Sequence, residues 1–339
     1  MLEALIIIAI SALLMLLLMP RLLPRLKKMK FGQTIYELGP KHQQKQGTPN
    51  MGGILIGSIS AVVMIAGVAV WVIRNGRVFF ELSNPLFGLL FITLSSMAIG
   101  FADDYIKDVK KRHDGLNPKQ KLVAQLVVGF VFSFYCREYV GTKILLPFTT
   151  ATWDLKWAYV PVMTVAVMFM TNSANLQDGL DGLLSTVTAI GMLAFGAACF
   201  AMRNYLSESA RVVILSGCAA LCGSVVGFLK FNHYPAKIFM GDTGSMFIGG
   251  MMIGVGMLST CVLPMLLFCL TSVCSSLSVM LQVMYFKATH GKRLFKMSPI
   301  HHHFELCGMK EPQIVLMYGA VTMVASILAV LCMLATIRA

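Results

Sequence analysis

Apolar residues occur along the chain in blocks of about 20 positions, and short polar stretches separate the blocks. A helix of about 20 residues crosses a hydrocarbon core of ~30 Å. The pattern therefore predicts an all-α polytopic membrane protein with ten transmembrane helices. The spans are expected near residues 2–20, 51–73, 84–102, 121–137, 157–173, 183–202, 210–230, 244–260, 262–286 and 313–336.

Composition supports the same class of protein. Apolar residues make up 57% of the 339 positions and charged residues only 13%, with a mean hydropathy of +0.76. In soluble proteins about a quarter of residues are charged. We expect a single transmembrane domain over residues 1–339 and no soluble domain.

The basic residues indicate how the chain is oriented. If the N-terminus faces outward, the five inward loops hold 20 of the 28 Lys and Arg and all seven histidines. Because Lys and Arg concentrate in cytoplasmic loops, both termini are expected outside, with the working face in the cytoplasm. The net charge of +13 then reflects topology and requires no nucleic-acid partner.

Two adjacent carboxylates, Asp103 and Asp104, follow the third predicted span directly. Neighbouring carboxylates repel each other unless a cation or a proton lies between them, which favours a metal site or a proton shuttle. An ordinary acidic helix end is the alternative, because Lys107 lies four residues after Asp103 and on the same helical face.

A second acidic loop follows the fifth span and contains Asn172, Asn175, Asp178 and Asp181. Asp-Gly pairs also form plain turns, and an Asp can cap the next helix. This loop holds no basic residue of its own, however, so its two carboxylates need a partner from elsewhere in the chain.

The third acidic loop has the sequence Gly241-Asp242-Thr243-Gly244. Its glycines allow the backbone to approach a ligand, Asp242 can bind a divalent cation, and the amides that open the next helix can bind phosphate. Helix capping by Asp242 or Thr243 is compatible with this role. Three inward loops that bring Asp to one membrane depth predict a Mg²⁺–pyrophosphate site.

Cations and further polar side chains lie in the same loops. The lysines that could offset phosphate charge are Lys45, Lys107, Lys119 and Lys121. Ser298 and Pro299 predict the start of a short helix outside the bilayer, which ends before Gly308. Its three histidines, His301, His302 and His303, would point in three directions, so contact with substrate is a better interpretation than a zinc site. Gln282 fits either a helix–helix hydrogen bond or a site contact.

Four motifs together resemble the polyprenyl-phosphate N-acetylhexosamine-1-phosphate transferase superfamily. They are Asp103-Asp104-x-x-Lys107, Asn175-x-x-Asp178-Gly-x-Asp181-Gly, Phe239-Met-Gly-Asp242-Thr-Gly-Ser and Ser298-Pro-Ile-His301-His302-His303-Phe-Glu. The histidine motif and Lys45-x-Gly-Thr-Pro look most like the phospho-N-acetylmuramoyl-pentapeptide transferase branch. Asn50 departs from the Thr that is usual there, which concerns hydrogen bonds to the sugar rather than the reaction.

The resemblance implies ten spans in a bacterial cell membrane, a homodimer, and transfer of phospho-MurNAc-pentapeptide from its UDP carrier to undecaprenyl phosphate. The products are UMP and lipid I, the first membrane intermediate of peptidoglycan synthesis. It also implies that Asp242 ligates Mg²⁺, that Asp103 acts as base or orienting group, and that Asp104 completes the catalytic set. The expected substrate-binding residues are Lys45, Asn50, Lys107, Lys119, Lys121, Asn172, Asn175, Asp178, Asp181, Asn232, Phe239, Gln282, His301, His302 and His303, with Asn232 and Phe239 placed for uracil.

Several alternatives remain open from the sequence. Asp103 could attack covalently before the lipid phosphate does, or the lipid phosphate could attack directly. A sister enzyme that uses UDP-N-acetylglucosamine would share the chemistry, although the histidine motif argues against it. A cation-coupled transporter would place charges deep within its spans, whereas here they lie at one face.

Overall fold

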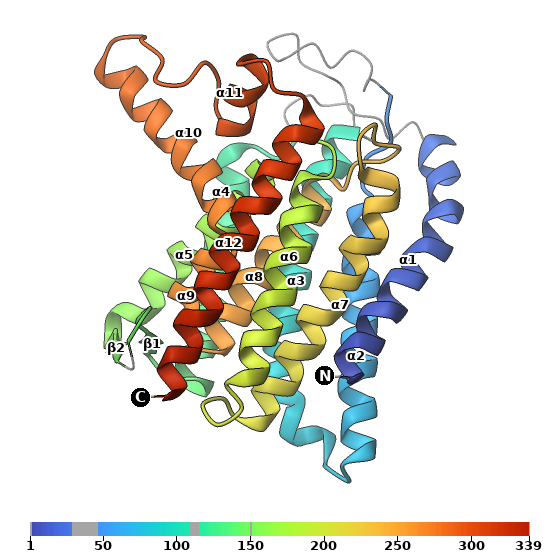
Figure 1. The fold of residues 1–339 in the computed structure, drawn as a ribbon, viewed down its shortest axis with the longest axis vertical. Coiled ribbons are helices and arrows are strands. Elements are labelled where there is room, and N and C mark those ends of the chain that lie inside the picture. The colour runs from blue at the N-terminus through green and yellow to red at the C-terminus, as the bar shows by residue number, and fades with distance from the viewer. Residues whose placement is uncertain (1, 29–46, 109–114, 150, 339) are drawn as a thin grey trace.

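The structure is a computed structural model that describes residues 2–28, 47–108, 115–149 and 151–338. Helices make up most of the described chain (Figure 1). The first half contains α1 Leu2–Lys28, α2 Gly53–Arg74, α3 Phe79–Asp108, α4 Pro118–Tyr139, β1 Lys143–Leu145, β2 Thr152–Asp154, the 3-10 turn Lys156–Ala158 and α5 Tyr159–Gln177. The second half contains α6 Leu183–Ala201, α7 Glu208–Asn232, α8 Gly241–Leu258, α9 Val262–Phe268, α10 Leu270–Ala288, α11 Ile300–Leu306 and α12 Glu311–Arg338.

The fold is that of a multi-span membrane protein. Within the described ranges, seven helices are long and apolar enough to cross a membrane, namely α1, α2, α3, α4, α6, α7 and α12. The pair α9–α10, which is bent by 89°, would make an eighth span. Helices α5 and α8 lie outside this set, and each carries polar residues near one end, such as Asn175 and Asp242. Both chain ends lie toward the end of the bundle opposite α11 (Figure 1).

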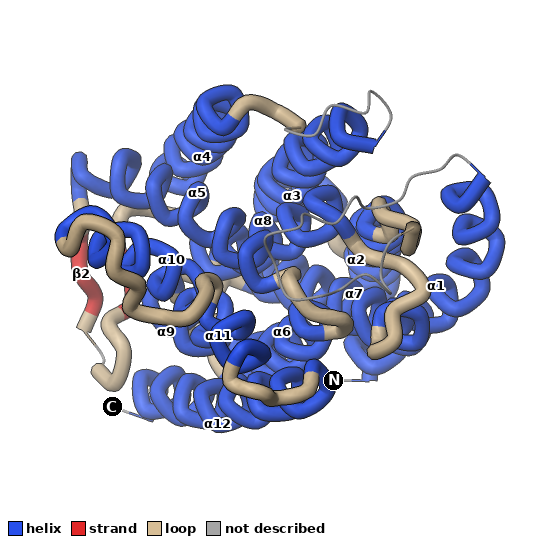
Figure 2. Tube along the Cα trace, turned by 90° about the horizontal axis from the view of Figure 1, so that it is seen from above, coloured by secondary structure: helices blue, strands red, loops and turns tan. Residues whose placement is uncertain are grey.

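Helix α8 forms the centre of the bundle. Every residue from Thr243 to Leu258 is buried. The helix packs against α2, α3, α5 and α7, and it lies in the middle of the bundle when seen from above (Figure 2). A helix that is apolar and buried on all sides suits this position. Its first turn carries Asp242, so the packing of α8 places that carboxylate at one end of the bundle.

Glycines allow the first turn of α8 to touch its neighbours through the backbone. A Cβ added to Gly53 of α2 would lie 2.1 Å from the Gly244 amide nitrogen, and one added to Gly100 of α3 would lie 2.2 Å from the Asp242 carbonyl oxygen. Gly241 has a φ of +72°, which only glycine adopts at little cost. Small residues in membrane helices permit this close approach of backbones.

The loop between α4 and α5 forms a short antiparallel hairpin. Strand β1 pairs with β2 in the register Lys143↔Asp154, Ile144↔Trp153 and Leu145↔Thr152. The Leu145 amide also donates to the Thr260 carbonyl at 2.9 Å, which joins the hairpin to the turn before α9.

The predicted span 262–286 is not one straight helix. Its residues form α9 and α10, which meet at Cys269 with a bend of 89°. Both pieces are apolar, so the hydropathy pattern could not reveal the bend. Helix α10 consequently leads away from the bundle toward α11 (Figure 1).

The predicted start of the helix that carries the three histidines is wrong by one residue. Pro299, rather than Ser298, is the N-cap of α11, and the Ile300 amide donates to the Ser278 hydroxyl of α10 at 3.0 Å. The cap therefore comes from a distant helix, which local sequence rules cannot foresee.

The glycine contacts can be tested with Gly100→Ala. The new methyl group would collide with the backbone of Asp242, and overpacking of this kind costs about 1–3 kcal/mol. We expect the thermal unfolding midpoint to fall by several degrees. Gly319→Ala in α12 is the matched control, because its Cβ would meet nothing closer than 3.4 Å. Equal midpoints for the two variants would contradict the proposed close contact.

Candidate functional site

Asp104 closes the N-terminus of α8 from the neighbouring helix α3. It is 1% exposed. Its Oδ1 accepts from the Asp242 amide at 3.1 Å, and its Oδ2 accepts from the Thr243 amide at 2.8 Å and the Thr243 hydroxyl at 2.6 Å. A carboxylate at this position satisfies amides that open a helix and interacts favourably with the helix dipole. The predicted capping of α8 by Asp242 or Thr243 is therefore replaced by a cap from α3.

Asn50 reinforces the same contact. Its side chain is buried, and its Nδ2 donates to Asp104 Oδ1 at 3.4 Å. The two amides of Asp242 and Thr243, which the sequence suggested for phosphate, are used by Asp104. These two amides therefore do not point at an open site, contrary to the role that the sequence suggested for them.

Two carboxylates and two lysines form what we call the carboxylate–lysine cluster: Asp103, Asp242, Lys107 and Lys121. Asp242 Oδ2 lies 2.8 Å from Lys121 Nζ and 3.1 Å from Lys107 Nζ. Lys107 also forms an ion pair with Asp103, and Lys121 lies 3.8 Å from Asp103. Three helices, α3, α4 and α8, thus contribute charges that balance one another, as partly buried charges require.

Further polar groups surround the cluster. Asp103 Oδ1 accepts from the Leu116 amide at 2.8 Å. Asn175 Nδ2, from α5, donates to Asp242 Oδ1 at 2.7 Å and to the Ser245 hydroxyl at 2.9 Å. The predicted convergence of three loops is therefore observed, but the second loop reaches Asp242 through an amide. Asn172 lies elsewhere, since its Nδ2 donates to Gln125 of α4 at 3.0 Å.

The rest of the second loop is joined to the loop after α7. Asp181 Oδ2 accepts from the Ala236 amide at 2.9 Å. Asn232 Oδ1 accepts from the Gly182 amide at 3.2 Å, and its Nδ2 donates to the Ile238 carbonyl at 3.0 Å. Phe239 is half-buried, with its backbone amide donating to Pro49 at 2.9 Å. Asn232 and Asp181 thus hold Phe239 and the start of α8 in place.

The three histidines of α11 have different surroundings. His301 is fully buried over Gly179, where an added Cβ would lie 2.2 Å from its Nε2. Burial, aided by His302, lowers the pKa of His301 to about 3, so the ring is neutral at pH 7. His302 Nδ1 lies 2.6 Å from Glu305, and His303 Nδ1 accepts from the Lys296 amide at 3.2 Å. Within the described residues no group of three His, Cys, Asp or Glu side chains is arranged for a metal.

Gln282 supports the histidine helix from α10. Its Oε1 accepts from the amides of Leu294 and Phe295 at 3.1 and 2.9 Å, and its Nε2 donates to the Phe295 carbonyl at 3.1 Å. Both ends of the amide are therefore bound to the backbone that leads into α11. The predicted contact of Gln282 with substrate stays a prediction. In the structure its side chain holds the backbone segment that leads into α11.

The remaining predicted residues are more peripheral. Lys119 is exposed in the first turn of α4, where its backbone amide donates to the Asn117 cap at 3.1 Å. Asp178 is half-buried at the C-terminus of α5. Lys45 lies outside the described residues.

Sequence reasoning missed several partners of the site. Ser245 binds Asn175, and Glu311 at the start of α12 accepts from the Asp181 amide at 3.3 Å. Ser245 stands one turn after Gly241, so a search for hydroxyls on the Asp242 face of the helix would have found it. Nothing in the local sequence signals Glu311, because its partner lies 130 positions away.

The geometry suits chemistry on phosphate esters. Two carboxylates can bind a divalent cation, and two lysines can bind phosphate oxygens as point charges. All four side chains stand near the ends of membrane helices.

Comparison with known proteins agrees with this chemistry. The family model described as glycosyl transferase family 4 matches residues 86–261, which include the whole carboxylate–lysine cluster. A phospho-N-acetylmuramoyl-pentapeptide-transferase of Bacillus subtilis is 43% identical over 316 residues, covering 93% of each chain. Proteins of the same name from Caldicellulosiruptor bescii and Geobacillus thermodenitrificans are 39% and 41% identical, covering 96% and 95% of each chain.

The burial of neutral His301 generates a prediction on pH. In the unfolded chain the His301 ring takes up a proton near its ordinary pKa of 6.5, whereas in the folded chain its pKa is about 3. The free energy of unfolding therefore falls as pH drops below 6.5. Between pH 6.5 and 5 the loss is of the order of 1–2 kcal/mol. We expect the unfolding midpoint of His301→Gln to fall less than that of the parent chain between pH 7.5 and 5. The exposed His233→Gln is the control, and it should fall as the parent does.

Proposed function

The chain belongs to the phospho-N-acetylmuramoyl-pentapeptide transferases of glycosyl transferase family 4, and on this premise we propose the reaction of its site. The enzyme transfers phospho-MurNAc-pentapeptide from UDP-MurNAc-pentapeptide to undecaprenyl phosphate, which yields lipid I and UMP. The observation that carries the proposal is the meeting of Asp103, Asp242, Lys107 and Lys121 at one end of the bundle.

We further propose ten spans, with α5, α8 and the bent pair α9–α10 added to the seven long apolar helices. The position of both chain ends at one end of the bundle supports an even number of crossings (Figure 1). The excess of Lys and Arg in the loops at the other end supports a cytoplasmic site and outward termini in a bacterial cell membrane. A homodimer is proposed from the family resemblance alone.

We propose Mg²⁺ as the cofactor, held by Asp242 with Asp103 beside it. Mg²⁺ takes one or two protein carboxylates and completes its shell with water and substrate phosphates. The paired carboxylates of the cluster fit that requirement, and a closed set of three protein ligands is not needed. When bound, the ion would neutralise charge on the transferred phosphoryl group.

The reaction exchanges one phosphoanhydride bond for another, while the phosphoester bond to the sugar stays intact. An oxygen of undecaprenyl phosphate forms a bond to the phosphorus that carries the sugar, and the bond from that phosphorus to the bridging oxygen breaks. The electron pair leaves with UMP. Since both substrates are anionic, their mutual repulsion is the main barrier, and Lys107 and Lys121 would lower it by binding phosphate oxygens.

Asp103 is proposed to orient these lysines. Its buried carboxylate is paired with Lys107 and accepts from the Leu116 amide, so both oxygens are in use. The acceptor phosphate is already ionised at neutral pH and needs no strong base. These contacts favour direct attack by the lipid phosphate over a covalent intermediate on Asp103.

The two loops joined by Asn232 form the proposed nucleotide end of the site. Phe239 offers an aromatic face there, and Asn232 fixes the backbone beside it. Neutral His301 can donate one hydrogen bond and accept one, which suits an uncharged part of the UDP-sugar substrate. Its rigid position depends on Gln282 and Ser278 of α10.

Asp242→Asn tests the central carboxylate. The change should lower turnover by about 10²-fold or more, because it removes one negative charge that binds the cation and both lysines. UMP release by purified protein measures this. Glu138→Gln, at the far end of α4, is the control and should keep parental activity. Near-parental activity of Asp242→Asn, with an unchanged unfolding midpoint, would refute its role.

The donor and the metal can be tested in one assay. Protein supplied with undecaprenyl phosphate and Mg²⁺ should release UMP from UDP-MurNAc-pentapeptide and not from UDP-N-acetylglucosamine. EDTA should stop the release, and added Mg²⁺ should restore it. Release from the N-acetylglucosamine donor would assign the chain's activity to the sister reaction, and activity that survives EDTA would refute the proposed metal.

A further inference from the structure

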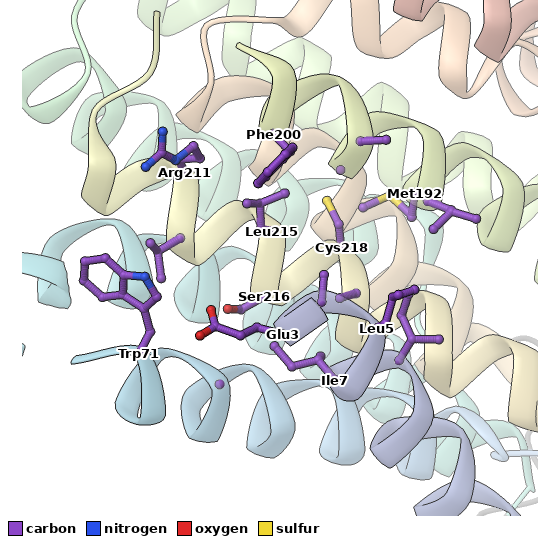
Figure 3. Close-up of a pocket in the computed structure, with 18 of the residues that line it drawn as sticks. Glu3, Leu5, Ile7, Trp71, Met192, Phe200, Arg211, Leu215, Ser216 and Cys218 are labelled. Atoms are coloured by element: carbon purple, nitrogen blue, oxygen red, sulfur yellow. The ribbon is translucent and has the colours of Figure 1, made fainter. Parts of the chain in front are cut away.

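A pocket lies at the end of the bundle opposite the carboxylate–lysine cluster. It occupies the space between α1 and α6, which both pack against α7, and it extends to the end of α2 (Figure 3). Its volume is about 340 Å³, within the range of small-ligand sites. The residues assigned to the proposed reaction lie at the other end of the bundle.

The walls of the pocket are mostly apolar and partly open to the side. Met192 and Cys218 are buried at the wall, whereas Leu5 is 57% exposed and Leu193 is 53% exposed at the mouth. Gly196 lets α6 approach α7 closely beside the pocket, since an added Cβ would lie 3.3 Å from the Cys218 Cβ. In a membrane such an opening faces hydrocarbon, so an apolar chain rather than water will fill it.

Polar residues gather at one end of this pocket. Arg211 and Trp71 lie toward that end in Figure 3, whereas Met192 and Leu5 lie toward the other. Tryptophan is enriched where a membrane meets water, which places the polar end at headgroup depth. The pocket therefore has the two-part character of a lipid, with an apolar body and a polar tip.

The charges at the polar end leave a positive excess. Glu3 accepts from Arg74 at 2.9 Å, and Glu208 binds Arg77 at 3.0 Å. Arg211 lies 3.9 Å from Glu208 and donates to the Arg203 carbonyl at 3.3 Å. Arg203 is exposed at the rim and forms no ion pair with another described residue. Among the charged lining residues Glu3, Arg203 and Arg211, the sum is one positive charge, which matches one phosphodiester.

We propose that this pocket binds one anionic glycerophospholipid from the leaflet away from the carboxylate–lysine cluster. One acyl chain lies between α1 and α6, and the phosphodiester lies at Arg203 and Arg211. If this face were a symmetric interface between two copies of the chain, the positive rims of the two copies would face each other and repel. The charge of the rim therefore favours an anionic lipid over a second copy. The bound lipid packs against α1 and α7 and stabilises the bundle at that end.

Native mass spectrometry of the full chain in a non-ionic detergent tests the proposal. Phosphatidylglycerol and phosphatidylethanolamine with identical acyl chains are titrated separately. One phosphatidylglycerol should bind per chain, about fivefold or more tighter than phosphatidylethanolamine, because each arginine near the surface contributes about 1 kcal/mol toward an anionic headgroup.

Three variants locate the site. Arg203→Gln combined with Arg211→Gln should weaken phosphatidylglycerol binding about tenfold or more, and the paired lysine variant should restore most of it. Ala197→Trp should abolish binding because the indole fills the pocket. Arg137→Gln is the matched control, since Arg137 stands at the same end of the bundle at the end of α4. UMP release in detergent should stay parental in all variants, which shows that each is folded.

Four results would overturn the proposal. Equal affinity for the two lipids, or an equal effect of Arg137→Gln, would remove the headgroup site. Unchanged lipid binding by Ala197→Trp would show that the lipid binds elsewhere. A shift in oligomeric state of Ala197→Trp, with lipid binding intact, would make this face an interface between copies of the chain.

Discussion

The contact between Asp104 and the first turn of α8 is the interaction on which the site depends. A buried helix end leaves amides without partners unless another group of the protein accepts their hydrogen bonds. Asp104 satisfies two of these amides and a hydroxyl at once. Because the cap comes from α3, it also fixes the neighbouring Asp103 relative to Asp242, and that pair is what the lysines bind.

The glycines make this arrangement possible at short range. Gly53 and Gly100 bring α2 and α3 against the backbone of α8, so two carboxylates from different helices can lie within reach of the same ammonium groups. The cost of crowding Asp103 and Asp242 is offset by Lys107 and Lys121. The cluster is thus a balanced set of two negative and two positive charges, contributed by three helices.

Much of this could be predicted from the sequence, and the limits have physical causes. Apolar blocks predicted the seven long apolar helices among the described residues, while the count of ten stays a prediction. Adjacent acidic residues at a span end singled out Asp103, and the Gly-Asp-Thr-Gly loop singled out Asp242. Local rules could not show that Asp104 caps α8 or that Asn172 binds Gln125, because each of these contacts depends on a partner from a remote segment. They could not show the bend at Cys269 because the residues on both sides of it are apolar. The histidine helix was predicted from Pro299 and Gly308. The side chains of Ser278 and Gln282, which bind the backbone at and before its start, come from α10 and could not be assigned from the local sequence.

The position of the cluster at the ends of α3 and α8 has a consequence for kinetics. One substrate arrives by diffusion through a volume and the other by diffusion within a surface. The supply of the donor therefore scales with its molar concentration, whereas the supply of the acceptor scales with its mole fraction among lipids. A cell that enlarges its membrane without making more acceptor dilutes only the second, and the output of the enzyme then follows membrane area as well as nucleotide supply.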